Sequence, residues 1–63
     1  MSLSDVYRAA VALESEFGDD AHDIALERAK ARLGQADHDG HRHWTQVAWA
    51  LGEMRQRLPD RRH

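Results

Sequence analysis

The sequence predicts an all-α protein, a small three-helix bundle with helices at about residues 3–17, 20–33 and 39–58. Apolar residues recur at three- and four-residue steps, which places them on one face of an α-helix. No segment shows the alternating, β-branched pattern of a strand. Glycine and aspartate stand between the helical segments, where helices end and begin.

The size of the chain allows one domain, at residues 1–58, followed by a short basic tail at residues 59–63. A chain of 63 residues buries only about 60% of the surface that its unfolded form exposes, so its core alone gives little stability. Because there is no cysteine, disulfides and thiolate metal sites are excluded. Regular helix packing, oligomerisation or a metal held by other ligands is then expected to stabilise the fold.

The charge of the chain is nearly balanced, with 11 acidic and 9 basic residues. This balance gives no general attraction to nucleic acid or to an anionic membrane. No apolar run approaches the roughly 18 to 20 residues that span a bilayer, and the N-terminal residues lack the pattern of a secretion signal. We therefore expect a soluble, cytoplasmic protein with no membrane partner.

The first helix is expected to start with a capping-box-like Ser2-x-x-Asp5 and to run to Phe17. Gly18 can adopt the left-handed backbone that ends helices, and Asp19 or Asp20 can cap the next helix with a carboxylate. The predicted core face of this helix consists of Val6, Ala10, Leu13 and Phe17.

The second helix is rich in alanine and in straight-chain residues, which lose little entropy in helical form. Its apolar arc is broad, and this width predicts packing against two neighbours. Arg28 lies inside the arc, where its stem can pack while its guanidinium meets an acid or an aromatic face. Gly34 is expected to end the helix. The arc comprises Ala21, Ile24, Ala25, Leu26, Ala29 and Leu33.

The third helix is expected to begin between Asp37 and His41 and to end at Leu58, because Pro59 disfavours helical geometry in the residue before it. Asp37 or Asp39 can cap it. We interpret Trp44, at its start, as a core residue stacked on Arg28. The predicted core stripe is Trp44, Val47, Leu51, Met54 and Leu58.

Several of these positions together resemble a family of small proteobacterial helical proteins that has no assigned function. The family's skeleton is a helix ending in Gly-Asp-x-Ala, an Arg-Ala pair, a Gly-Asp-x-x-Gly loop and a last helix led by tryptophan. The resemblance implies the fold and structural roles for Gly18, Arg28, Asp37, Gly40 and Trp44, and it implies no activity. Ala36 and Trp49 depart from the family, which tends to have glycine and a polar residue there. The residues that match are Phe17-Gly18-Asp19-Asp20-Ala21, Arg28-Ala29, Leu33, Asp37, Gly40, Trp44, Val47, Leu51 and Met54.

Trp49 lies on the side of the third helix opposite its core stripe, so we expect its ring to face solvent. A large exposed ring on a small domain usually marks a surface that meets another molecule. Val11 and Leu26, which also fall off the main stripes of their helices, are expected to extend this surface. The alternative is that Trp49 packs inside its own subunit, because tertiary packing often overrides idealised helical wheels.

The densest set of possible metal ligands is His38, His41 and His43 with Asp37 and Asp39. Imidazole and carboxylate groups suit zinc, nickel or iron. However, His41 and His43 are two residues apart, so on one helix their side chains point about 200° apart. The alternative is that an aspartate caps the helix and the histidines are solvated.

Nucleic-acid binding and catalysis are less favoured by the sequence. The second and third helices resemble a helix-turn-helix, with Arg42, His43 and Gln46 as reading side chains, but few basic residues flank them. Three short helices hardly enclose a catalytic cleft. We therefore expect no enzyme activity and no cofactor. The favoured function is protein binding, as a homodimer or as an accessory subunit of a larger assembly, with a metal-binding module as the alternative and DNA binding third.

Overall fold

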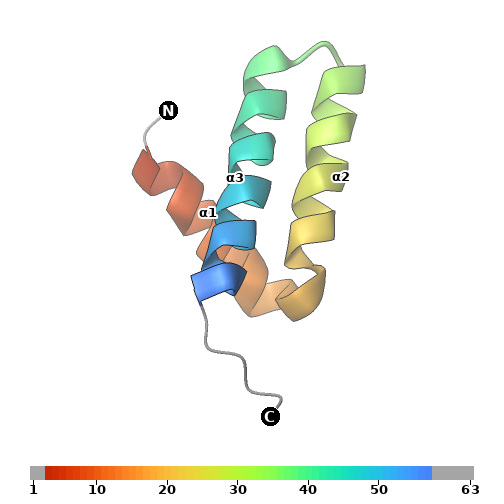
Figure 1. Ribbon diagram of the computed structural model, residues 1–63. Coiled ribbons are helices and arrows are strands. Elements are labelled where there is room, and N and C mark those ends of the chain that lie inside the picture. Colours follow the sequence, from red (N-terminus) through yellow and green to blue (C-terminus); the bar gives the residue numbers. More distant parts are fainter. Residues whose placement is uncertain (1–2, 58–63) are drawn as a thin grey trace.

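The computed structural model describes the backbone of residues 3–57 and the side chains of residues 4–54. Every described residue outside positions 35–37 is helical, and no strand occurs in this range. The elements are α1 (Leu3–Phe17), the 3₁₀ helix η1 (Gly18–Asp20), α2 (Ala21–Gly34) and α3 (His38–Arg57) (Figure 1). The all-α class is thus confirmed. The expected helix end at Leu58, the capping residue Ser2 and the basic tail lie outside the described residues.

The helices follow one another with fewer breaks than expected. Helical residues run without interruption from Leu3 to Gly34, and α3 follows after three non-helical residues. Gly18 has a φ of +59° and turns the chain, as its position predicts. The expected carboxylate cap on α2 is wrong for Asp20, which occupies the cap position but makes no side-chain cap hydrogen bond. The 3₁₀ turn replaces this cap, because the Ala21 N–H donates to the Gly18 carbonyl.

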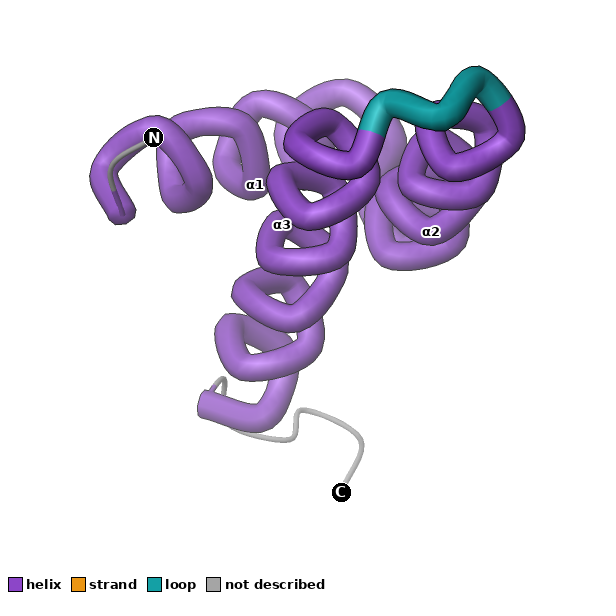
Figure 2. Tube along the Cα trace, turned by 90° about the horizontal axis from the view of Figure 1, so that it is seen from above, coloured by secondary structure: helices purple, strands orange, loops and turns teal. Residues whose placement is uncertain are grey.

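α2 and α3 lie side by side and antiparallel, whereas α1 crosses behind α3 at a steep angle (Figures 1 and 2). The contact of α2 with α3 is the most extensive in the structure, and α1 packs mainly on α3. α3 is therefore the central helix. As predicted, the second helix contacts two neighbours, α3 extensively and α1 to a smaller extent. Leu26 and Leu33, at the edges of its apolar arc, are nevertheless 41% and 49% exposed.

The core is small and rich in alanine. The buried residues of α2 are alanines only, at intervals of four residues. Such a stripe has no bulky side chains to keep the neighbouring helix at a distance. The buried residues are Val6, Ala10 and Leu13 from α1, Ala21, Ala25 and Ala29 from α2, and Val47, Ala48, Ala50 and Leu51 from α3.

The predicted core faces of α1 and α3 are confirmed, apart from Leu58, which lies outside the described residues. Phe17, Trp44 and Met54 are partly buried and pack on the core, to which the fully buried residues of both faces belong. Arg28 stacks on Trp44 as expected, with its Cζ atom 5.0 Å from the ring centroid. Ala48 and Ala50 are buried in addition to the predicted stripe. They widen the buried face because α3 is covered from two sides.

None of the described helices combines the length and the apolar character needed to cross a membrane.

The turn between α2 and α3 contains a left-handed alanine. Ala36 has a φ of +59°, and its N–H donates to the Leu33 carbonyl at 3.0 Å. The Asp37 N–H donates to the Arg32 carbonyl at 2.9 Å. Gly34 ends α2 as expected, since it is the last helical residue, and the left-handed residue follows it at position 36. Alanine thus adopts the backbone that glycine usually supplies after a helix.

Replacing Ala36 with glycine should stabilise the protein, because a residue with a Cβ atom is strained in the left-handed region. We expect the free energy of unfolding to rise by about 1 kcal/mol, measured by urea denaturation. Ala12→Gly is the matched control at an exposed, helical position of α1. There the same substitution should lower the free energy of unfolding by about 1 kcal/mol. A loss of stability in both variants would contradict the strain assigned to Ala36.

Candidate functional site

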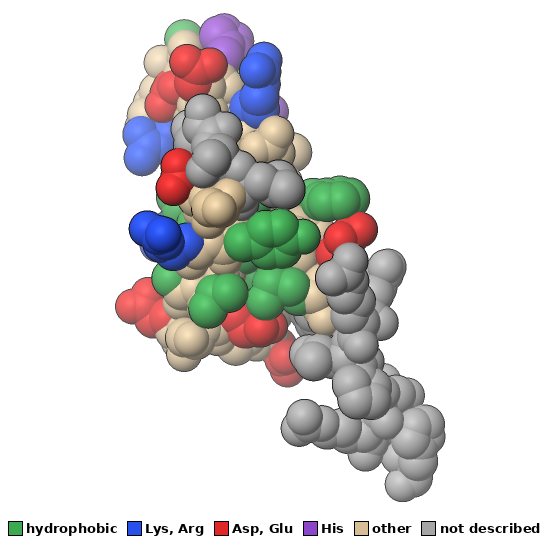
Figure 3. Space-filling view, turned by 90° about the vertical axis from the view of Figure 1, so that its left-hand side faces the viewer, with side chains coloured by type: hydrophobic (Ala, Val, Ile, Leu, Met, Phe, Trp, Pro, Cys, Tyr) green, Lys and Arg blue, Asp and Glu red, His purple; other side chains and the backbone are tan. Residues whose placement is uncertain are grey.

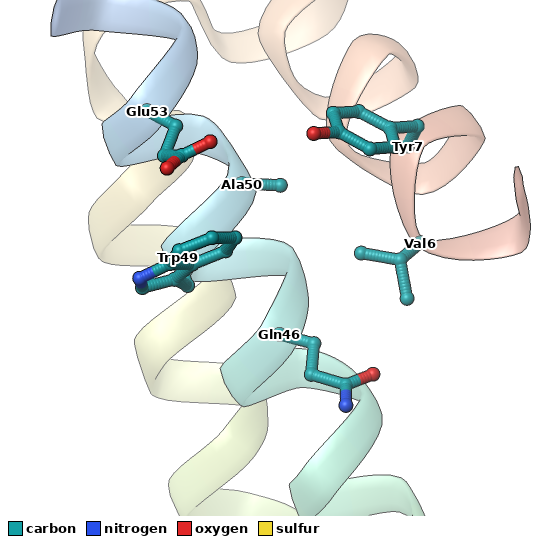
Figure 4. A pocket seen from close by; sticks show the side chains of 6 residues that line it. All are labelled: Val6, Tyr7, Gln46, Trp49, Ala50 and Glu53. Carbon is teal, nitrogen blue, oxygen red and sulfur yellow. The ribbon is translucent and has the colours of Figure 1, made fainter. Parts of the chain in front are cut away.

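An apolar groove lies between α1 and α3, with a volume of about 400 Å³ (Figure 4). Val6 and Ala50 are buried and belong to the core beneath it. The Tyr7 ring stands on the α1 side and the Trp49 ring on the α3 side, with the Ala50 methyl group between them. The lining residues are Val6, Tyr7, Gln46, Trp49, Ala50 and Glu53.

The groove follows from helical spacing on α3. Gln46, Trp49, Ala50 and Glu53 stand at intervals of three, one and three residues, so they share one side of the helix. On α3, the small Ala50 lies among larger side chains. On the opposite side, Tyr7 comes from α1, which crosses α3 at an angle. A hollow therefore remains where two ridges of side chains diverge.

Trp49 is 64% exposed, more than any other large hydrophobic side chain of the described residues. This confirms the expected exposure, and the alternative that the ring packs within the subunit is wrong. The residue also lines a second hollow, together with His22 of α2 and the buried Ala48. Ala48 thus lies beside an α2 residue and Ala50 beside an α1 residue. Trp49 stands between these two sides of α3, where no described helix covers it.

The expected surface is only partly assembled. Val11 and Leu26 are 52% and 41% exposed, but neither lines the groove, and Leu26 comes from α2. Tyr7, which the sequence analysis did not select, takes the place beside Trp49. Tyr7 follows Val6, a residue of the core face, and so lies at the border of that face. This border position is the sequence feature that could have indicated Tyr7 as part of the surface. Seen from the side of α1, hydrophobic side chains gather in the middle of the surface with charged ones around them (Figure 3).

The metal-ligand candidates are not brought together. His41 points back to α2, where its Nδ1–H donates to the Ala29 carbonyl at 2.9 Å. His43 packs edge-on against Trp44, with ring centroids 5.1 Å apart. His38 and Asp39 are exposed. Within the described part of the chain, no group of three histidine, aspartate or glutamate side chains is placed to hold a metal ion.

Asp37 caps α3. Its Oδ1 atom accepts the Gly40 N–H at 2.9 Å, and its carbonyl accepts the His41 N–H at 2.9 Å. A Cβ atom on Gly40 would overlap the Asp37 carboxylate and approach the Arg32 Cδ atom to 3.1 Å. The spacing Asp-x-x-Gly therefore has a physical reason, since the capping side chain occupies the space that a larger residue would need.

The residues considered for DNA reading do not form a basic face. His43 is half-buried against Trp44, and Asp39 lines the same hollow as Arg42, His43 and Gln46. A carboxylate at this place opposes contact with phosphate. Thr45, a candidate nucleophile by residue type, donates its hydroxyl to the His41 carbonyl at 2.7 Å, as helical threonines commonly do.

No family model, curated protein or solved structure matches the chain. The resemblance to the proteobacterial family accordingly stays a proposal.

The cap at Asp37 gives a prediction that separates hydrogen bonding from charge. Asp37→Ala should lower the free energy of unfolding by about 1 kcal/mol, because the Gly40 N–H loses its acceptor. Asp37→Asn should retain most of the stability, since an amide oxygen also accepts this bond. The Arg32 Nη1 atom lies 3.7 Å from Asp37 Oδ2 on the surface, and such a pair contributes little. Equal losses in the two variants, measured by thermal and urea denaturation, would assign the stability to the ion pair instead.

Proposed function

We propose that the chain is a three-helix bundle of the bacterial cytoplasm, related to the small proteobacterial proteins, that acts as a non-enzymatic protein-binding module. The partner is a second copy of the chain or a larger assembly in which this protein is an accessory subunit. Trp49 and the groove beside it are the binding surface. The exposure of Trp49 is the observation that carries this proposal.

The energy available from Trp49 is large for one side chain. An aromatic residue buries about 150–250 Å² at an interface, and most of the Trp49 ring is still exposed to solvent. Covering the exposed part would contribute on the order of 3 kcal/mol at about 25 cal/mol per Å². A contribution of this size is typical of the few residues that dominate protein interfaces.

The groove supports a protein partner over a small polar ligand. Val6 and Ala50 give it an apolar floor, and Tyr7 adds a second aromatic ring with a hydroxyl group. Tyrosine and tryptophan are enriched at the centres of protein interfaces. An apolar side chain of a partner would fill the space between the two rings, while Gln46 and Glu53 would lie at the polar rim.

Catalysis and metal binding find less support in this geometry. Among the described residues that line the groove, only Tyr7 and Glu53 are titratable, and none forms a nucleophile–base pair. The histidines that would hold a metal point in different directions. A protein-binding role requires neither arrangement.

The substitution Trp49→Glu tests the proposal. A charge at this position should abolish binding while leaving the fold intact, because the side chain contributes little to the core. Sedimentation equilibrium at increasing concentration detects self-association, and capture through a photo-crosslinker beside position 49 detects a larger partner. The melting temperature should stay within about 3 °C of the wild type, as for a surface substitution.

Leu33→Glu is the matched control, since Leu33 is 49% exposed on a helix but lies outside the groove. This variant should bind as the wild type does. Identical association and identical crosslinked partners in the wild type and in Trp49→Glu would overturn the proposed function.

A further inference from the structure

The segment Leu3–Gly34 departs from one continuous α-helix only around the 3₁₀ turn Gly18–Asp20. Within it, Gly18 is the only described residue with a positive φ, at +59°. Phe17 before it has φ −115° and ψ −8°, and Asp20 has φ −83° and ψ −8°, so both are already in the right-handed region. A change at Gly18, with small adjustments beside it, would join α1 and α2 into one helix of about 48 Å.

Gly18 is needed for its conformation and not for its size. A Cβ atom built at this position meets no heavy atom within 4 Å. A substitution here therefore acts on the backbone preference alone, without a clash that would obscure it. Residues with a Cβ atom disfavour the left-handed region and favour the helical one.

The packing of α1 makes such an opening feasible. α1 contacts α3 more extensively than it contacts α2, whereas α2 and α3 have their own, larger contact. If α1 swung away, its buried residues Val6, Ala10 and Leu13 would become exposed. The side of α3 that contains Ala50 would also lose its cover.

We propose that α1 exchanges between two copies of the chain about Gly18, so that the α1 of each copy packs on the α3 of the other. A second copy is the occupant that fits, because its α1 carries the side chains that already fill this face within one subunit. Exchange of an identical element is a route to dimers that needs no new interface. This inference goes beyond the Trp49 surface and does not depend on it.

The test uses Gly18→Ala and its mirror, a synthetic chain with D-alanine at position 18. L-alanine favours the open, helical hinge by about tenfold per chain, and therefore favours the dimer by about a hundredfold. D-alanine favours the positive φ and should hold the monomer. After refolding at millimolar concentration, sedimentation equilibrium should show the largest dimer fraction for Gly18→Ala, a smaller one for the wild type and the smallest for the D-alanine chain.

Isotope-filtered NMR on a mixture of labelled and unlabelled Gly18→Ala chains locates the contact. Under the proposal, intermolecular contacts join the α1 methyl groups of one copy to the α3 methyl groups of the other, and the double variant with Trp49→Glu still dimerises. A folded, monomeric Gly18→Ala, or a dimer joined only through Trp49, would overturn the exchange; the second result would support the proposed function. If Gly18→Ala does not fold, equal dimer fractions in the wild type and the D-alanine chain overturn it.

Discussion

The close packing of α2 on α3 along Ala21, Ala25 and Ala29 is the contact on which the rest of the structure depends. These residues are almost fully buried, and they face a helix whose own core includes Val47 and Leu51. The fully buried side chains of α2 are methyl groups only, with Ile24 partly buried beside them. Stability therefore comes mainly from close approach over a long contact and not from a few large side chains. α2 and α3 together form a frame, and α1 packs on another side of α3.

The exposed tryptophan is a consequence of this frame. α3 is covered on two sides, by α2 beside Ala48 and by α1 beside Ala50, and Trp49 stands between them. The described part of the chain offers no further helix to cover that direction. A polar residue would satisfy the fold equally well here, and this supports the proposal that the ring contacts another molecule.

The sequence was sufficient to predict the helices, the stripes of α1 and α3, the Arg28–Trp44 stack and the exposure of Trp49, because helical periodicity and turn residues determine them. It did not identify α3 as the central helix. Alanine occurs on both the surface and the core face of helices, so the burial of Ala48 and Ala50 was not predicted. Three features depend on how the helices meet, which periodicity does not encode. They are the missing cap hydrogen bond of Asp20, the left-handed backbone of Ala36 and the position of Tyr7 in the groove.

Native-state hydrogen exchange measures directly whether α2 and α3 form the stable frame and α1 an attached element. Protection reflects the free energy of the opening that exposes each amide. The slowest amides should lie in the middle of α2 and α3, around Ala25 and Val47, with exchange governed by global unfolding. Those of α1 should exchange earlier, through an opening that leaves the other two helices intact. Amides of α1 that exchange as slowly as those of α2 and α3 would contradict this hierarchy.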